Sequence, residues 1–283
     1  MISVGEALTR GTKAIDGYRI SQTPLLDASL LLCKTTGLSR EQLYSKSDSL
    51  LSDSAESLYV SLIKRRCEHE PIAYLIGERE FFGRTFTVTP DVLIPRSDTE
   101  ILVETALELV KEKPAQRILD LCTGSGCIGI SLAAELPDSE VTLADISEGA
   151  LQVATENAQR LLNRPVTILQ SDLFSACTDT YFSLIATNPP YLTQSWFDQT
   201  EAQVKAEPAL ALLGGDADGL AIIRSIVDQA PKHLHPRGIL LIECDFRQQS
   251  AIMDLLSERG FSHIESKKDL AQLHRVVWGV LDV

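Results

Sequence analysis

The region from residue 117 to residue 281 alternates short apolar runs with amphipathic segments, and this alternation constrains the fold most. Strands are expected at 117–121, 141–144, 166–169, 182–186, 238–242, 261–266 and 275–281. Helices are expected at 128–136, 150–162, 218–235 and 248–258. Such alternation indicates a parallel sheet with helices on both faces, and the last two strands are close enough in sequence to pair antiparallel. The prediction is an α/β fold with a mostly parallel, seven-stranded sheet.

The first 75 residues have a different pattern and predict a small helical bundle. Thr23 and Pro24 are typical of a helix start, and Gly37 is typical of a helix end. The segment 39–42 reads as a capping box, in which the first and fourth residues satisfy each other's backbone donors. A further helix is expected to begin at 52–53. No residue type here suggests chemistry, so this part is interpreted as a packing or docking domain.

The segment that follows carries β-forming residues around a glycine turn at 80–88, which predicts a hairpin. Ser97 and Glu100 have capping-box spacing and predict a helix that ends near Lys113. Arg96 and Glu100 are interpreted either as a cap and a solvated charge or as groups that face a substrate. The predicted domains are a helical docking domain, a hairpin connector and a catalytic domain, at 1–75, 76–95 and 96–283.

Composition narrows the range of partners. The 283 residues carry a net charge of −13, which disfavours the phosphate backbone of nucleic acid. No apolar run is long enough to span a membrane, and the N-terminus lacks the pattern of a signal peptide. The six cysteines are scattered, which predicts free thiols and a cytoplasmic location. His233 and His235 lack further ligands nearby, so no metal site is expected.

A glycine-rich segment follows the first strand of the predicted sheet. Gly124, Gly126 and Gly129 fit the spacing G-x-G-x-x-G between a strand and a helix. Glycines at these positions allow a tight turn and close approach of a ligand to the backbone. The spacing alone permits either a dinucleotide or S-adenosyl-L-methionine as the ligand.

Acidic residues end the next two strands. Asp145 is expected to accept hydrogen bonds from ribose hydroxyls, and Asp172 from an adenine amino group. Leu173 and Phe174 are expected to pack on the adenine ring. Because ligands of open parallel sheets bind at the carboxyl ends of strands, these groups predict one cofactor site. The acidic rim suits a cationic sulfonium and not a pyrophosphate, which favours S-adenosyl-L-methionine.

The fourth strand ends in the tetrad Asn188-Pro189-Pro190-Tyr191. Asn188 offers both an amide carbonyl and an amide N–H₂ group. The two prolines stiffen the chain and donate no backbone hydrogen bond, and Tyr191 adds a flat aromatic face. The tetrad is either a turn that ends a strand or a rigid, acceptor-rich corner that grips a planar group with N–H donors.

Taken together, the glycine loop, the acidic strand end, Ser171-Asp172-Leu173-Phe174 and the tetrad resemble the Rossmann-like class I S-adenosylmethionine-dependent methyltransferases that act on amino groups. Three further segments, 71–83, 93–100 and 207–220, resemble the bacterial peptide-chain release factor glutamine N5-methyltransferases. The resemblance covers nearly the whole chain. The chain departs from that family's pattern at Cys122, Leu173 and the segment 243–245.

The resemblance implies a substrate and a set of site residues. The substrate is the glutamine in the Gly-Gly-Gln loop of class I release factors, the helical N-terminal domain holds the release factor, and S-adenosyl-L-homocysteine is the second product. The implied catalytic residues are Asn188, Pro189 and Tyr191, with Pro190 also contacting the substrate. The implied cofactor-binding residues are Cys122, Thr123, Gly124, Ser125, Gly126, Asp145, Asp172, Leu173 and Asn188. A monomer is expected.

Three other functions are compatible with parts of the sequence. A nucleic-acid amino-methyltransferase shares the tetrad, but it predicts a basic face and a recognition insertion that this sequence does not show. An NAD-dependent oxidoreductase shares the glycine spacing. A non-catalytic binding protein on the same fold is disfavoured by the intact tetrad.

Overall fold

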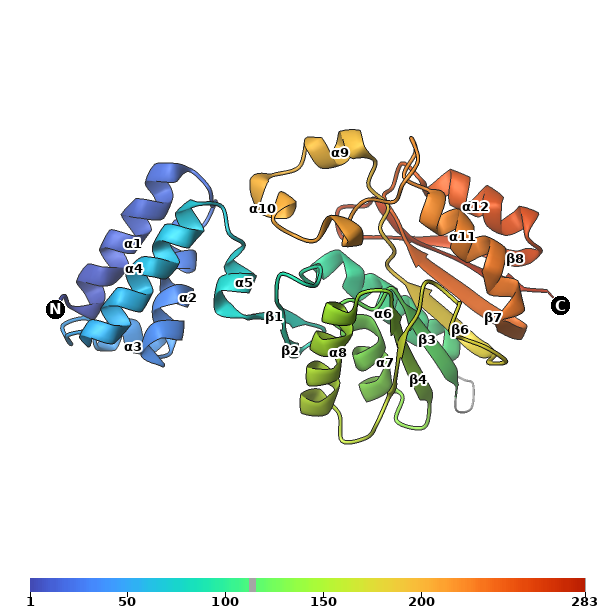
Figure 1. The fold of residues 1–283 in the computed structure, drawn as a ribbon, viewed down its shortest axis with the longest axis horizontal. Coiled ribbons are helices and arrows are strands. Elements are labelled where there is room, and N and C mark those ends of the chain that lie inside the picture. The colour runs from blue at the N-terminus through green and yellow to red at the C-terminus, as the bar shows by residue number, and fades with distance from the viewer. Residues whose placement is uncertain (112–115, 283) are drawn as a thin grey trace. The chain divides into compact units, whose positions relative to one another are not determined.

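The structure, a computed structural model, describes residues 1–111 and 116–282, which form two compact units (Figure 1). The first unit comprises Met1–Glu78 together with Glu201–Ala206. The second comprises Arg79–Thr200 and the chain from Glu207 onward. Within the described ranges, every helix is too short or too polar to cross a lipid bilayer.

The first unit is helical, as predicted. Its helices are α1 (Val4–Tyr18), α2 (Pro24–Thr36), α3 (Arg40–Ser45), α4 (Asp53–Cys67), α5 (Ile72–Ile76) and the short α10 (Ala202–Lys205). The predicted start of α2 at Pro24 and its end at Gly37 are confirmed, with Gly37 left-handed at φ 70°. The capping box is also confirmed, because the Ser39 and Gln42 side chains each bond the other's backbone N–H. Ser52 caps α4.

A buried ion pair ties the helices of the first unit together. The guanidinium of Arg66 on α4 donates to Asp27 on α2 at 2.8 Å, and both side chains are less than a tenth exposed. The same guanidinium donates to the backbone carbonyls of Ile20 and Glu70, at 3.3 and 3.1 Å. A buried charge with several partners is costly to disrupt but adds little net stability, so the apolar core remains the main source of stability.

The second unit contains the predicted sheet (Figure 1). Its strands are β3 (Arg117–Leu121), β4 (Glu140–Asp145), β5 (Thr167–Gln170), β6 (Phe182–Thr187), β7 (Leu234–Glu243), β8 (Phe261–Lys268) and β9 (His274–Leu281). They lie in the order β5-β4-β3-β6-β7-β9-β8. Pairing is parallel from β5 to β7, and β9 is antiparallel to both neighbours. The predicted seven-stranded sheet with an antiparallel final strand is confirmed.

Successive strand residues face opposite sides of the sheet and so build two cores. On β6, Leu184 and Ala186 join the core under α6 (Glu100–Val110), α7 (Cys127–Glu135) and α8 (Glu148–Leu161). Ile185 between them joins the core under α11 (Ala221–Gln229) and α12 (Gln249–Glu258). Both faces are therefore covered, which explains the nearly continuous apolar strands.

The predicted hairpin is confirmed as β1 (Glu78–Phe81) and β2 (Arg84–Thr87). Asn157 on α8 fixes β2 within the second unit, because its amide accepts from the Thr87 N–H at 2.7 Å and donates to the Thr87 carbonyl at 3.0 Å. The same amide donates to the Ser125 carbonyl at 2.9 Å. One side chain thus joins the hairpin to the glycine loop.

Three predictions about where elements begin or end are wrong. The helix expected at 218–235 is α11, which ends at Gln229, and β7 begins at Leu234, earlier than the predicted 238. The capping box at Ser97 does not form within the described chain, where a 3-10 helix over Ser97–Thr99 precedes α6. Glu100 instead accepts a hydrogen bond from the Phe82 N–H at 3.0 Å. The predicted helix end near Lys113 lies outside the described residues.

Candidate active site at the carboxyl ends of the strands

The glycine loop connects β3 to α7 in a backbone conformation that its residues suit. Gly124 and Gly126 have φ values of 54° and 82°, where a side chain is strained. Gly129 lies on the first turn of α7, where an added Cβ would come within 2.8 Å of the Asp120 Cβ. The loop is therefore held closely against the end of β3 and leaves bare backbone facing outward.

Two carboxylates fix this loop. Asp120 is fully buried and accepts from the Thr123 hydroxyl at 2.5 Å and from the Gly129 N–H at 2.8 Å. Asp145 accepts from the N–H groups of Gly124 and Ser147, each at 2.9 Å. Burial raises the pKa of Asp120 to about 7 and also raises the pKa of Asp145. Each carboxylate retains lone pairs beyond those used by the loop.

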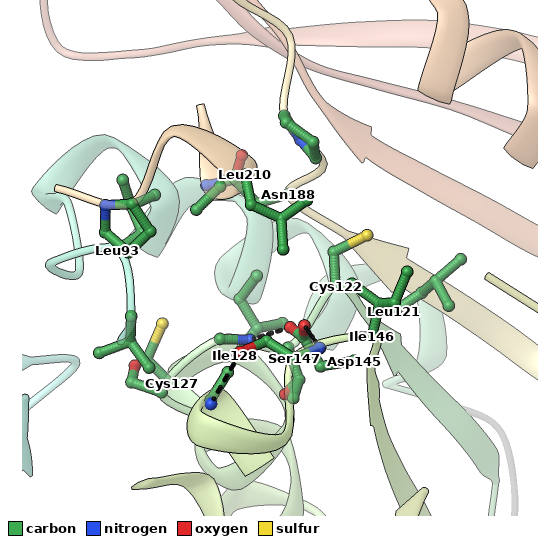
Figure 2. Close-up of a pocket in the computed structure, with 18 of the residues that line it drawn as sticks. Leu93, Leu121, Cys122, Cys127, Ile128, Asp145, Ile146, Ser147, Asn188 and Leu210 are labelled. Carbon is green, nitrogen blue, oxygen red and sulfur yellow. Dashed lines mark hydrogen bonds between the residues drawn. The ribbon is translucent and has the colours of Figure 1, made fainter. Parts of the chain in front are cut away.

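A cavity lies over the loop and collects most of the predicted site residues. Figure 2 shows Asn188 and Leu210 on one side of it and Asp145 and Ser147 on the other. The predicted residues in its lining are Cys122, Thr123, Gly124, Ser125, Asp145, Asp172, Leu173, Asn188 and Pro190. Four predicted residues lie outside the lining, namely Gly126, Phe174, Pro189 and Tyr191.

The segment after β5 agrees only partly with its predicted role. Asp172 is exposed at the cavity, and Leu173 lines it with a φ of 48°. The prediction that Phe174 packs on a ligand ring is wrong. Its side chain is 3% exposed and stacks on the His233 ring, with centroids 4.7 Å apart. Phe174 therefore belongs to the core, and His233 is its stacking partner.

Cys122 and Leu173, where the chain departs from the family pattern, share an unusual backbone. Both have positive φ, 60° for Cys122 and 48° for Leu173, a region that favours glycine. Burial raises the pKa of the Cys122 thiol to about 12. The thiol is therefore neutral and serves as part of the apolar wall.

Residues that are distant in sequence contact the tetrad at the end of β6 and the residue that follows it. The Leu192 N–H donates to the Leu212 carbonyl at 2.8 Å, and the Gly214 N–H donates back to Leu192 at 3.0 Å. An added Cβ on Gly219 would clash with the Tyr191 carbonyl. The Gln248 amide also donates to that carbonyl, at 2.9 Å. The long loop after β6 thus returns and packs on the corner.

Arg96 and Glu207 anchor this loop at the rim of the cavity. Arg96 lines the cavity and donates to the Glu207 carboxylate at 2.6 Å. The other oxygen of Glu207 accepts from the Ile94 N–H at 3.0 Å. The Glu207 side chain is 2% exposed, so this is a nearly buried anchor. Arg96 is therefore an ion-paired and partly exposed residue at the cavity rim, and a contact with a substrate stays a prediction.

Sequence reasoning missed the residues beside Asn188. The Asn188 amide nitrogen donates to the Thr99 hydroxyl at 3.3 Å. Burial raises the pKa of the Glu243 carboxyl, at the end of the neighbouring strand β7, and the nearby Thr99 hydroxyl lowers it. Both side chains are buried. A buried threonine at a helix start carries no sequence signal of its own, and only the juxtaposition of three strand ends reveals it.

The chain is similar to known proteins over nearly its whole length. The family model of the methyltransferase small domain matches residues 97–214, and that of the PrmC N-terminal domain matches residues 6–77. A release factor glutamine methyltransferase from Burkholderia pseudomallei is 42% identical over 274 residues, which cover 95% of this chain and 96% of that protein. The protein of the same name from Escherichia coli K12 is 38% identical over 94% of this chain and 96% of its own length. This chain belongs to the release factor glutamine methyltransferases.

Solved structures agree on the fold. A 16S rRNA methyltransferase from Thermus thermophilus, solved with AdoMet and guanosine, superposes with a TM-score of 0.53 at 20% identity. The superposed region covers 72% of this chain and 49% of the Thermus thermophilus chain. A methyltransferase from Pyrococcus furiosus gives a TM-score of 0.52 at 15% identity, over 78% of this chain and 98% of that one. The class I methyltransferase fold predicted for this family member is confirmed.

Proposed function

We propose that this protein transfers a methyl group from S-adenosyl-L-methionine to the side-chain amide nitrogen, N5, of the glutamine in the Gly-Gly-Gln motif of class I release factors. S-adenosyl-L-homocysteine is the second product, and the modification supports translation termination. One observation carries the proposal. In a chain of this family, the Asn188 amide lines the same cavity as the glycine loop and Asp145.

The chemistry of the cavity wall fits S-adenosyl-L-methionine. Bare backbone at Gly124 allows an elongated ligand to approach closely. The Ser125 hydroxyl lines the cavity and, within the described residues, is buried without a hydrogen-bond partner. Asp145 and Asp172 add acceptors for ribose and adenine, and apolar side chains line much of the remaining wall. When bound, this cofactor supplies an electrophilic methyl group on a sulfonium.

The residues of the tetrad orient the accepting amide. An amide nitrogen is a poor nucleophile because its lone pair is delocalised into the carbonyl. The Asn188 side-chain oxygen and the Pro189 backbone carbonyl accept the two N–H bonds of the glutamine amide. Two fixed acceptors aim the nitrogen at the cavity and favour positive charge that develops on it. The proton leaves to water after transfer.

The other two tetrad residues shape this corner. Pro190 lines the cavity and offers an apolar surface to the flat amide. The Tyr191 ring packs against the core under α11 and α12, and we propose that it supports the substrate amide through the corner it stiffens. Cys122, Thr123, Gly126 and Leu173 complete the proposed cofactor site.

The partner and setting follow from the family and the charge. The first unit, matched by the PrmC N-terminal domain, is proposed to hold the release factor. We expect a monomer that acts in the cytoplasm without binding nucleic acid directly, since a net charge of −13 repels phosphate backbones.

The test is mass spectrometry of a release factor incubated with this protein and S-adenosyl-L-methionine labelled in the methyl group. The expected product is a peptide with one added methyl on the Gly-Gly-Gln glutamine, and a release factor with that glutamine replaced by asparagine should remain unlabelled. Parallel incubations use ribosomal RNA and DNA fragments. Label in nucleic acid and none in the release factor would establish the competing amino-methyltransferase of nucleic acids.

A further inference from the structure

We propose that Thr99 and Glu243 are positioning residues that decide which end of the Asn188 side-chain amide faces the cavity. This inference rests on the proposed function, because that function needs the oxygen of Asn188 to face the substrate. The two ends of a primary amide have nearly the same size, so packing alone does not choose between them.

The three side chains meet because of strand register. β6 and β7 are parallel neighbours with Thr187 opposite Ile242. Asn188 and Glu243 are therefore the next residues on adjacent strands. Thr99 reaches the same point from the 3-10 helix that precedes α6 and is 2% exposed. No local sequence pattern joins these three positions.

Hydrogen-bond bookkeeping sets the direction. A hydroxyl has one proton to donate, and an ionised carboxylate only accepts. When Thr99 donates to Glu243, its oxygen is left as an acceptor for the neighbouring amide. The N–H₂ end of Asn188 must then face Thr99, as it does at 3.3 Å. The carbonyl end of Asn188 is consequently free to accept an N–H bond from the substrate.

The surroundings of Glu243 make the carboxylate available for this task. Its Oε2 is buried and unpartnered in the described part of the chain. Burial raises the pKa of Glu243 to about 7, whereas the hydrogen bond with Thr99 and the charges of Arg275 and Arg96 lower it, and Asp98 raises it. At pH 8 the group is therefore ionised and can accept a hydrogen bond from the Thr99 hydroxyl.

Thr99→Val tests the proposal at pH 8, because valine keeps the shape and removes the hydroxyl. We expect kcat for release factor methylation to fall about tenfold, the scale of one misdirected hydrogen bond. The Kd of S-adenosyl-L-methionine should stay within about twofold. Thr99→Ser should restore most of the rate. Thr105→Val is the matched control, since Thr105 is a buried α6 residue whose hydroxyl bonds only its own helix, at Ile101.

A second readout follows the amide directly. In ¹⁵N-labelled protein, the Asn188 side-chain resonances are assigned by their loss in Asn188→Ala. Thr99→Val should shift these resonances, and Thr99→Ser and Thr105→Val should leave them in place. Unmoved resonances in Thr99→Val, or a moved pair with wild-type kcat, would overturn the positioning role. If the resonances move but the wild-type protein does not methylate the release factor, the proposed function is refuted. The contact between Thr99 and Asn188 would still be supported in that case.

Discussion

The two halves of the candidate site are held in place differently. The glycine loop is fixed by residues of one stretch of chain, since Asp120 binds Thr123 and Gly129, three and nine residues away, and Asp145 and Asn157 bind it from 21 and 32 residues away. The Asn188 corner is fixed by distant residues, since Thr99 is 89 residues away and the Gln248 contact to Tyr191 spans 57. A cofactor cradle can thus be encoded in one segment, whereas the substrate corner depends on the folded domain.

We expect the glycine loop to bind the cofactor and the Asn188 corner to orient the substrate. Asn188→Ala should have the largest effect of the variants that test this division. We expect kcat to fall about 100- to 1000-fold, the effect of removing one acceptor aimed at developing charge. Calorimetry should show that S-adenosyl-L-methionine still binds, though more weakly. Near wild-type turnover by this variant would refute the amide clamp.

Asp145→Ala addresses the other half. Loss of the carboxylate removes acceptors for the ribose and releases the Gly124 N–H. The Kd of S-adenosyl-L-methionine should rise about 10- to 100-fold, as expected for a charge-assisted hydrogen bond worth about 1.5–3 kcal/mol. At saturating cofactor, kcat should recover most of its value. A variant with unchanged Kd would remove Asp145 from the cofactor site.

Gly219→Ala tests how far the corner depends on the returning loop. Gly219 has a φ of 72°, and an added Cβ would clash with the Tyr191 carbonyl. Gly260 has a similar φ of 82°, with no described atom within 4 Å of an added Cβ. Alanine at Gly260 should cost about 1 kcal/mol of backbone strain, and alanine at Gly219 about 2 kcal/mol more.

Chemical denaturation measures both glycine variants, and the Gly219 variant should also lose kcat. Equal stability and equal kcat in the two would show that the corner tolerates a displaced loop.

Glu243→Gln is the smallest test and concerns pH. The folded-state pKa of Glu243, raised by burial to about 7, means that the folded protein favours the protonated form. Stability from this group is greatest below about pH 4.5, falls between pH 4.5 and 7, and stays low above pH 7. Arg275, Arg96 and Asp98 also influence this carboxyl.

The glutamine variant should therefore be more stable than wild type at pH 8, by about 1 kcal/mol. The raised pKa implies that the ionised Glu243 costs the wild type roughly 3 kcal/mol of stability at this pH. The variant avoids this cost, but its unpartnered amide hydrogens cancel part of the gain. At pH 4.5 the gain disappears and the cost of the unpartnered amide hydrogens remains, so the variant should be less stable than wild type by about 2 kcal/mol. Denaturation midpoints at the two pH values measure it, and a constant difference would contradict the raised pKa.

Much of the fold was predictable because it is written in local patterns. The predicted strands match the observed sheet, and the caps at Gly37, Ser39 and Ser52 form as expected. The errors occur where distant groups compete with local ones. Glu100 accepts a hydrogen bond from the hairpin at Phe82 and does not form the expected helix cap. Phe174 stacks on His233 and does not face the cavity.

By itself, the sequence determined the alternating fold, the glycine loop and the identity of the amide-bearing corner. Periodicity and turn residues act over a few neighbours, so they can be read without coordinates. Only the tertiary structure decided which groups meet at the Asn188 corner, because Thr99 contacts Asn188 and the loop that returns at Gly219 contacts Tyr191 from separate elements. The direction of a hydrogen bond depends on which groups are neighbours in space, and the register of the strands determines those neighbours.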